Sequence, residues 1–420
     1  MRITLFAAGS QGDVLFCLRL LPRLSAEGFE VLFAAPENFR ALAESYGVPF
    51  FGLRGDVKQI MASEPGKEFM ATGSRNPVKN IALMRKMVSR IAGEMSEDLL
   101  RACEQADALI TLAIFASLGA TVAELKQIPL LLIEPTPLLP TGDSPAPGWP
   151  VQANMGHLCN RLSGYAMLSF IFAWYKPSLN AFRRQNGLRA ITSRDFIRTL
   201  RTTPLLGAYS SAVIPKPSDW PDSARITGYW FEPDESMWQP SPDLAAFLAQ
   251  GEPPVYIGFG SMTAKDPEAL SRLVLDAVIR TGHRAVVATG WGAIAQQVAS
   301  ERVFVLDQAP HGWLFPRMRA IVHHGGAGTT AEALRAGKPS VIVPFIVDQQ
   351  FWGKRVETLG AGTVPIPVRK LTAVRLADAI EQACGERLQQ NAAEIGSAIR
   401  AEQGLERAVA LIRELCGNRL

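Results

Sequence analysis

The segment at residues 320–349, AIVHHGGAGTTAEALRAGKPSVIVPFIVDQ, determines the fold that we predict for this chain. Residues 320–323 form a short apolar run typical of a buried strand, and a glycine-rich turn follows it. We expect a helix to begin after this turn, at Thr329 or Thr330. The apolar run at 340–344 indicates a second buried strand, as in a parallel sheet. The pattern therefore predicts a strand, a turn, a helix and a strand of an α/β fold.

The glycine-rich turn has the chemistry of an anion site. A helix N-terminus presents unpaired backbone N–H groups and partial positive charge, and both favour a phosphate. Gly325, Gly326 and Gly328 let the backbone approach an anion closely, and threonine hydroxyls can cap the helix or donate to phosphate. His324 adds a further donor. The glycines alone are equally compatible with a purely structural link in which the histidines pack.

Asp348 and Gln349 favour a ligand site over that structural link. Both residues follow the second apolar run. Ligands of open α/β sheets bind outside the carboxyl ends of the strands, so these residues would line one crevice with His324. A carboxylate and a carboxamide are suitable partners for hydroxyl groups. The segment therefore predicts a ligand that carries both phosphate and hydroxyl groups.

Residues 310–356, PHGWLFPRMRAIVHHGGAGTTAEALRAGKPSVIVPFIVDQQFWGKRV, resemble the nucleotide-sugar signature of family-one glycosyltransferases. The form is similar to that of sterol 3-β-glucosyltransferases and of bacterial enzymes that glycosylate glycopeptide and macrolide aglycones. The resemblance implies an α/β chain of GT-B fold, with two Rossmann-like domains facing across a cleft. It assigns the donor diphosphate to His324, Gly326, Gly328, Thr329 and Ser261, and the sugar hydroxyls to Asp348 with Gln349.

Two of the resembled donor contacts lie outside this signature. Ser261 belongs to the turn GFGSM at 258–262, where the family's serine approaches the diphosphate; its alternative role is a turn or a cap. Gln308 is assigned to the edge of the nucleobase. Trp313 does not match the stacking tryptophan of the plant enzymes, and we interpret it as a packing residue.

The order of apolar runs predicts two Rossmann-like domains. Runs at 3–8, 31–35, 48–52, 107–112 and 129–134 alternate with helix-like stretches, which implies a parallel sheet. Prolines are dense between residues 211 and 250, as in a linker. With the resemblance, this predicts an acceptor-binding domain at 1–215, a linker at 216–250, a nucleotide-sugar-binding domain at 251–395, and a helix at 396–420 that packs back on the first domain.

Asp13 follows the first apolar run, in the loop GSQGDV at 9–14. Aspartate in such a place is often a helix N-cap, and the pattern alone favours that role. The loop also resembles the GSRGDV-type motif of the family, whose aspartate deprotonates the acceptor hydroxyl; Ser10 and Gly12 are assigned to the donor. Gln11 stands where the family often has Arg, and Leu15-Phe16 replaces its usual Gln-Pro.

A carboxylate with a pKa near ~3.9 is a weak base towards an alcohol. It can act if proton transfer is late, after the departing diphosphate has left an oxocarbenium-like sugar. The phosphate-binding loop then stabilises the leaving group, where charge develops. We therefore expect single displacement with inversion, in which an α-linked sugar nucleotide gives a β-glycoside.

Two segments of the first half are candidates for contact with apolar molecules. Residues 77–90, PVKNIALMRKMVSR, form an amphipathic basic stretch that either lies on an anionic membrane or is a solvated helix over a core stripe. Residues 165–175, YAMLSFIFAWY, follow a Pro- and Gly-rich loop at 135–150. They are either a buried helix or the wall of a pocket for a large apolar acceptor, as the acceptor site of the resembled family suggests.

The composition is that of a chain of two or three domains, with 48% hydrophobic and 20% charged residues. A net charge of +4 is too small to indicate a nucleic-acid partner. The five cysteines have no paired spacing, no apolar run reaches the ~20 residues of a membrane span, and the N-terminus lacks a signal-peptide core. We expect a cytoplasmic protein, with peripheral membrane contact as a further interpretation.

The resulting hypothesis is an inverting hexosyltransferase. It would move a sugar from a UDP- or TDP-sugar to a hydroxyl of a hydrophobic acceptor such as a sterol, macrolide, lipid or phenol. Asp13 would be the base, and no metal would be required if the helix dipole and His324 neutralise the phosphates. The alternatives are a non-catalytic GT-B partner or lipid-binding protein, and a sugar-nucleotide epimerase.

Overall fold

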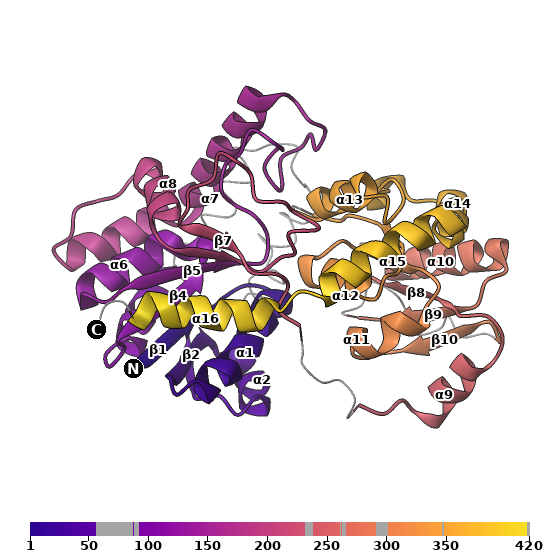
Figure 1. Cartoon of the computed structure of the whole chain (residues 1–420), viewed down its shortest axis with the longest axis horizontal. Helices are drawn as coiled ribbons and strands as arrows, with labels where there is room; N and C mark the ends of the chain where they lie inside the picture. Colours follow the sequence, from indigo (N-terminus) through magenta and orange to yellow (C-terminus); the bar gives the residue numbers. More distant parts are fainter. Residues whose placement is uncertain are drawn as a thin grey trace. The chain divides into compact units, whose positions relative to one another are not determined.

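The computed structural model describes residues 1–55, 87, 92–231, 238–260, 262, 266–290, 301–346 and 348–417. The chain forms two compact units, Met1–Trp230 with Gln403–Leu420, and Phe231–Glu402. Each unit contains a parallel sheet that is connected by helices (Figure 1). The predicted α/β class with two parallel-sheet domains is therefore confirmed.

In the described chain, the first unit has a seven-stranded sheet of order β3-β2-β1-β4-β5-β6-β7, with every pair parallel. Its strands are β1 (Arg2–Phe6), β2 (Glu30–Pro36), β3 (Phe50–Leu53), β4 (Ala108–Leu112), β5 (Leu130–Glu134), β6 (Leu205–Gly207) and β7 (Ala224–Ile226). Its helices include α1 (Gln11–Ala26), α2 (Arg40–Ser45), α6 (Ala116–Lys126), α7 (His157–Gln185) and α8 (Ser193–Thr202). The central strands are almost wholly apolar and buried, as a sheet covered on both faces requires.

The second unit has a five-stranded parallel sheet of order β10-β9-β8-β11-β12 within the described residues. Its strands are β8 (Val255–Gly258), β9 (Ala285–Ala288), β10 (Val303–Leu306), β11 (Ile321–His323) and β12 (Ser340–Ile342). Its helices are α9 (Pro242–Ala249), α10 (Pro267–Thr281), α11 (His311–Leu314), α12 (Ala327–Arg335), α13 (Gln349–Thr358), α14 (Ala373–Cys384) and α15 (Glu386–Arg400).

The order in which successive strands are added to the sheet reverses at one place in each sheet. In the first sheet the order turns between β1 and β4, and in the second between β8 and β11. Such topological switch points open a crevice at the carboxyl ends of the two strands, where α/β proteins bind ligands. The loops that follow these four strands are therefore the candidates for the functional site.

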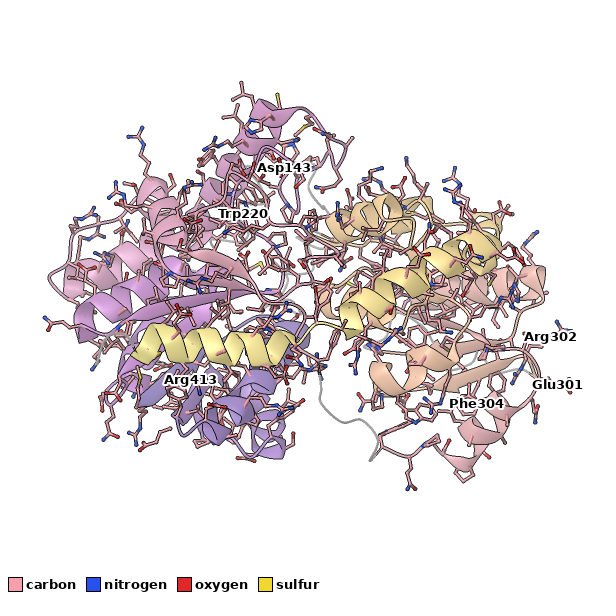
Figure 2. The ribbon with its side chains drawn as sticks, viewed as in Figure 1. Asp143, Trp220, Glu301, Arg302, Phe304 and Arg413 are labelled. Atoms are coloured by element: carbon pink, nitrogen blue, oxygen red, sulfur yellow. The ribbon has the colours of Figure 1, made fainter. Side chains whose placement is uncertain are left out.

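The C-terminal helix α16 (Gly404–Gly417) belongs to the first unit (Figure 1). Leu405, Ala408 and Ile412 are buried in the same apolar core as residues of α1. Arg413, labelled in Figure 2, bonds to Glu27 at 3.0 Å, just after the end of α1.

The unit boundaries differ from the predicted domains. The first unit extends to Trp230 instead of residue 215, because β7 within the proline-rich stretch pairs with β6. The return to the first unit begins at Gln403 instead of 396, because α15 stays with the second unit. The many prolines of residues 211–250 predicted irregular backbone, but Ala224–Ile226 within this stretch form a strand of the first sheet.

The predicted apolar helix at 165–175 is the middle of the longer α7, where Leu168, Ile171, Phe172 and Tyr175 are buried. Ser261 and all of 77–90 except Met87 lie outside the described residues, so their predicted roles stay predictions. Among the helices of the described chain, none is long and apolar enough to cross a membrane.

Candidate active site

His324 lies at the switch point of the second sheet, directly after β11. A Cβ atom built on Gly326 would lie 2.5 Å from its Nε2, and one built on Gly260, after β8, would lie 2.9 Å from its Cε1. The imidazole is therefore enclosed by two backbone segments that only glycine allows to come so close. These contacts bring the β8 and β11 loops together around one side chain.

The His324 side chain is buried but incompletely bonded. Only 8% of the residue is exposed, and within the described chain its Nδ1 has no hydrogen-bond partner. Burial lowers the pKa of His324 to about 4, so the imidazole is neutral at pH 7. Without a neighbouring anion the imidazole therefore offers a hydrogen bond. The part predicted for His324 in neutralising the phosphates stays a prediction, because a diphosphate beside the ring would raise its pKa.

Helix α12 begins at Ala327, not at Thr329 or Thr330 as predicted. Gly326 is the N-cap, and its carbonyl accepts bonds from both the backbone N–H and the hydroxyl of Thr330, each at 2.9 Å. The hydroxyl and the N–H of Thr330 are thus already bonded within α12. Gly328 and Thr329 lie in the first turn of the helix, where the backbone N–H groups have no acceptor within the helix. The positive end of the helix lies beside His324.

His323 is a site residue that the sequence reading did not select. It is fully buried, and its Nδ1 accepts the N–H of Gly325 at 3.1 Å, which fixes the turn into α12. Burial, followed by the neighbouring His324 and His311, holds the pKa of His323 far below its ordinary value. The residue is therefore neutral, with its proton on Nε2. The double-histidine motif was the only signal available.

Asp348 and Gln349 follow the loop after β12, as predicted, but their side chains differ in role. Gln349 is buried, and its Oε1 accepts the backbone N–H groups of Phe345 at 2.7 Å and Ile346 at 3.0 Å. Its Nε2 lies 3.3 Å from the sulfur of Met262. These bonds hold the loop that leads to half-buried Asp348. Only the amide N–H groups of Gln349 are left to meet a sugar hydroxyl, and that predicted contact stays a prediction.

The predicted nucleobase region lies after β10. Gln308 is exposed, and the neighbouring Asp307 accepts a bond from the Thr289 hydroxyl at 3.1 Å. Trp313 packs edge-on against Trp238, and the Arg317 guanidinium lies over its ring at 4.0 Å. These contacts agree with a packing role for Trp313.

Asp13 lies in the loop after β1, at the switch point of the first sheet. It is the third residue of α1, and the N-cap is Ser10, so the simple N-cap role considered from the sequence belongs to the serine. The backbone N–H and the hydroxyl of Ser10 both donate to Asp13 Oδ2 at 2.8 Å. Gly9 makes room for the carboxylate, since a Cβ there would lie 2.5 Å from Oδ2. Ser10 and Gly12 are exposed.

A second aspartate provides a comparison for Asp13. Asp195 occupies the same third position of α8, and Thr192 donates to its Oδ2 through N–H and hydroxyl, again at 2.8 Å. The bond from the Thr192 backbone, then Arg189, lowers the pKa of Asp195. For Asp13 burial outweighs the bonds from Ser10, and its pKa is raised. The same local motif therefore gives a stabilised carboxylate in α8 and a stronger base after β1.

Glu134, at the carboxyl end of β5, is a further buried acid that sequence reasoning missed. It is 1% exposed, accepts the hydroxyl of Tyr209 at 2.9 Å on Oε1, and accepts the N–H of Leu138 at 3.2 Å on Oε2. Burial raises the pKa of Glu134 to about 8. Its bonding partner Tyr209 is 75 residues away in the chain, so no local pattern announces the pair.

The buried Glu134 makes a pH-dependent contribution to stability. In the folded protein the Glu134 carboxyl group keeps its proton up to about pH 8, whereas in the unfolded chain it loses the proton above pH 4.5. The free energy of unfolding therefore falls as the pH rises from 4.5 to about 8, and it does not change further above pH 8. We expect a slope of up to about 1.4 kcal/mol per pH unit. Burial of the histidines has the opposite effect, because it makes the free energy of unfolding rise with pH, but this effect is confined to pH values below 6.5. Urea unfolding between pH 6.5 and 8 should therefore show the fall in wild type and a flatter profile in Glu134→Gln; parallel profiles would contradict it.

Among the described residues, no group of three or more His, Cys, Asp or Glu side chains is arranged to hold a metal ion.

Residues 272–406 match the family model of the erythromycin biosynthesis protein CIII-like C-terminal domain. The chain is 33% identical to the O-mycaminosyltylonolide 6-deoxyallosyltransferase of Streptomyces fradiae, over 100% of this chain and 98% of that protein. It is 32% identical to a sterol 3-beta-glucosyltransferase of Arabidopsis thaliana over 97% of its own length, and it spans 64% of that relative. It spans 30% of the sterol 3-beta-glucosyltransferase of Aspergillus oryzae, at 34% identity over 99% of this chain.

Solved structures support the same fold. A calicheamicin glycosyltransferase matches with a TM-score of 0.71 at 17% identity, covering 100% of this chain and 99% of that chain. The glycosyltransferase VinC, solved in complex with DTDP, matches with a TM-score of 0.70 at 18% identity and full coverage of both chains. At these identities the likeness shows the fold alone, which is GT-B.

Proposed function

The chain belongs to the family-one glycosyltransferases of GT-B fold, and on this premise we propose that it is an inverting hexosyltransferase with a UDP- or TDP-sugar as donor and a hydrophobic alcohol or phenol as acceptor. Glycosyl transfer from a nucleotide sugar is the activity of the family. The inversion, the base and the class of acceptor are the parts that we propose.

The observation that carries the proposal is the surroundings of His324. A neutral imidazole with an unbonded, buried Nδ1 lies between Gly260 and Gly326, beside the N-terminus of α12. Burying a polar atom without a partner costs free energy, which a ligand acceptor would recover. Together with the first-turn N–H groups of Gly328 and Thr329, this arrangement suits the diphosphate of the donor.

Transfer would proceed by one displacement. The acceptor oxygen attacks the anomeric carbon as the bond to the diphosphate oxygen breaks, and Asp13 takes the acceptor proton. The loop around His324 and the helix dipole of α12 stabilise the charge on the departing diphosphate. Asp348 would accept hydrogen bonds from the sugar hydroxyls, and Gln349 would hold the loop that carries it. Attack opposite the leaving group inverts the anomeric centre.

The acceptor class follows from the relatives. Their names specify a sterol in one case and a macrolide intermediate in the other, and both are large apolar alcohols. We therefore expect an acceptor of this class for the present chain. The place of Asp13 supports transfer over the rival role of a non-catalytic partner: it follows β1 at the switch point, is held by Ser10 at 2.8 Å, and has room only because residue 9 is glycine.

A nucleotide thermal-shift panel tests the donor side. We expect UDP or TDP to raise the melting temperature while GDP has a smaller effect, with the same shift in magnesium and in EDTA. At a ligand concentration of 100 Kd the stabilisation is about 2.7 kcal/mol, which is a shift of several degrees. The matched control is His283→Ala, a half-buried histidine of the same unit that pairs with Glu381, and it should keep the shift. No shift with any nucleotide would favour the lipid-binding or partner role.

A further inference from the structure

The chain passes between the two units twice, and side chains hold each passage. The first connection runs from Trp230 to Phe231, and the second runs from Glu402 to Gln403. The proposed base Asp13 belongs to the first unit, and the proposed diphosphate loop belongs to the second. Transfer therefore needs the two units in one arrangement, and the residues that hold the connections can affect the reaction without touching the reacting atoms.

In the first unit, the first connection is bound to α1, the helix that carries Asp13. Trp230 is buried, and its ring packs against Phe16 with the two centroids 5.4 Å apart. The carbonyl of Trp230 accepts a hydrogen bond from Arg19 Nη1 at 2.9 Å, and its indole N–H donates to the hydroxyl of Thr227 at 3.0 Å. Phe16 and Arg19 lie within about two helical turns of Asp13. A ring contact and a charge-assisted hydrogen bond therefore fix this end of the connection to α1.

In the second unit, the first connection is bound to α12, the helix whose first turn belongs to the proposed diphosphate site. Phe231 is half-buried, and the guanidinium carbon of Arg335 lies 4.5 Å from the centroid of its ring, as in a cation–π contact. Arg335 is the last residue of α12 and pairs with the buried Glu332 at 3.4 Å. The nine residues of α12 span about 12 Å. One short helix therefore joins the glycine-rich turn to Phe231.

The second connection is also bound to α12. Helix α15 packs on the end of α12 so closely that a Cβ on Gly396 would lie 2.7 Å from Gly337 Cα and 2.8 Å from the carbonyl oxygen of Leu334. Arg400, the last residue of α15, donates a hydrogen bond to the carbonyl of Arg335. Arg335 therefore contacts the first connection through its side chain and the second through its backbone.

The two connections lie against each other where they enter the first unit. A Cβ on Gly404 would lie 2.2 Å from the carbonyl oxygen of Tyr229, the residue before Trp230. Gly404 begins α16, which shares an apolar core with α1. Both connections thus lead from α12, the helix of the diphosphate loop, to α1, the helix of the proposed base.

We propose that Arg335 is a positioning residue of the transfer reaction, because it fixes the two connections to the helix that binds the donor. This rests on the proposed function. A stiff joint limits the arrangements of the two units and raises the fraction of molecules in which the base and the donor can meet, which raises kcat. Loss of the Arg335 side chain leaves the glycine-rich turn as it is. It should therefore lower kcat and leave nucleotide affinity unchanged.

Two variants remove the contact from opposite sides. Arg335→Ala removes the guanidinium, and Phe231→Leu keeps an apolar side chain without an aromatic face and leaves the pairing of Glu332 intact. For each we expect kcat to fall about tenfold, within the range of a cation–π contact, while the Kd for UDP or TDP stays within twofold of wild type. Phe231→Tyr keeps the aromatic face and should keep the wild-type kcat. The proposal is overturned if Phe231→Leu, once folded, has the kcat of wild type.

The matched control is Arg284→Ala in the same unit. Arg284 places its guanidinium 4.0 Å from the ring centroid of Phe247 and also donates to the carbonyls of Phe247 and Gln250, away from both connections in the sequence. Its loss should lower the melting temperature about as much as Arg335→Ala while kcat stays within twofold of wild type. An equal fall in kcat would mean that any loosening of the second unit slows transfer, and would count against a positioning role.

Small-angle X-ray scattering separates this inference from the proposed function, because it reports the arrangements of the two units without any reaction. We expect a larger mean radius of gyration for Arg335→Ala and Phe231→Leu than for wild type and Arg284→Ala. If wild type transfers no sugar to any acceptor, the proposed function fails while the scattering still tests the joint. Scattering profiles identical to wild type in both joint variants would overturn the proposal, even if kcat fell.

Discussion

Asp13→Asn is expected to lower kcat by between about 10² and 10⁴, the usual contribution of a general base. Asparagine has nearly the same shape, and its Oδ1 can still accept both bonds from Ser10, so α1 keeps its cap. It cannot take the acceptor proton. The glycine-rich loop around His324 belongs to the other unit, and the bonds that hold Ser10 are kept, so nucleotide binding should not change. Product formation under single-turnover conditions, together with the UDP or TDP thermal shift, measures both effects.

The control for this variant is Asp195→Asn. Asp195 has the same position in its helix and the same two bonds from a capping hydroxyl residue, at equal distances. It lies in the first turn of α8, which follows α7 and precedes β6, and not in the loop after β1 or β4. Its replacement removes a stabilised carboxylate and should lower the melting temperature while kcat stays within twofold. Equal kcat values for wild type and Asp13→Asn would exclude Asp13 as the base.

The alternation of strands and helices along the chain, and the location of the candidate site at the carboxyl edge, could be predicted from the sequence, because both depend on local patterns. Apolar runs such as 320–323 and 340–344 correspond to β11 and β12, and each is followed by the residues that form the crevice. Parallel strands place their carboxyl ends at one edge, so Asp13 and His324 could be assigned to switch points without coordinates.

The helix start in the glycine-rich turn was predicted two or three residues late. Threonine is a common cap, so Thr329 and Thr330 were reasonable choices. The structure uses Gly326, because the hydroxyl of Thr330 reaches back to the Gly326 carbonyl and because a larger residue at 326 would strike His324. The choice depends on a side chain outside the helix, which periodicity does not encode.

The roles of Gln349 and Glu134 could not be predicted, because they depend on burial and on distant partners. Gln349 bonds backbone groups three and four residues away and contacts Met262, far along the chain. Glu134 depends on Tyr209 and on complete removal from water. The sequence shows that both residues are polar, but only the structure shows that their polar atoms form hydrogen bonds in the interior of the protein.

His324→Ala is expected to have the second largest effect, a loss of about 10²- to 10³-fold in kcat/KM for the donor, as for other groups that stabilise a leaving charge. The change removes the N–H that would face the diphosphate and leaves a void between Gly260 and Gly326. The loss is that of a hydrogen bond to the diphosphate and of the packing of the imidazole between the two glycines. The UDP or TDP thermal shift should disappear.

Gly326→Ala tests the same site without removing the histidine. The added Cβ would lie 2.5 Å from His324 Nε2, so the imidazole must move, although α12 keeps its N-cap backbone. We expect the donor KM to rise towards that of His324→Ala while the protein stays folded. His324→Ala with Gly326→Ala should be little worse than His324→Ala alone, because the alanine at 326 then has nothing to displace. Additive losses would show that Gly326 contributes through its own backbone, and that His324 is not the group that the turn positions.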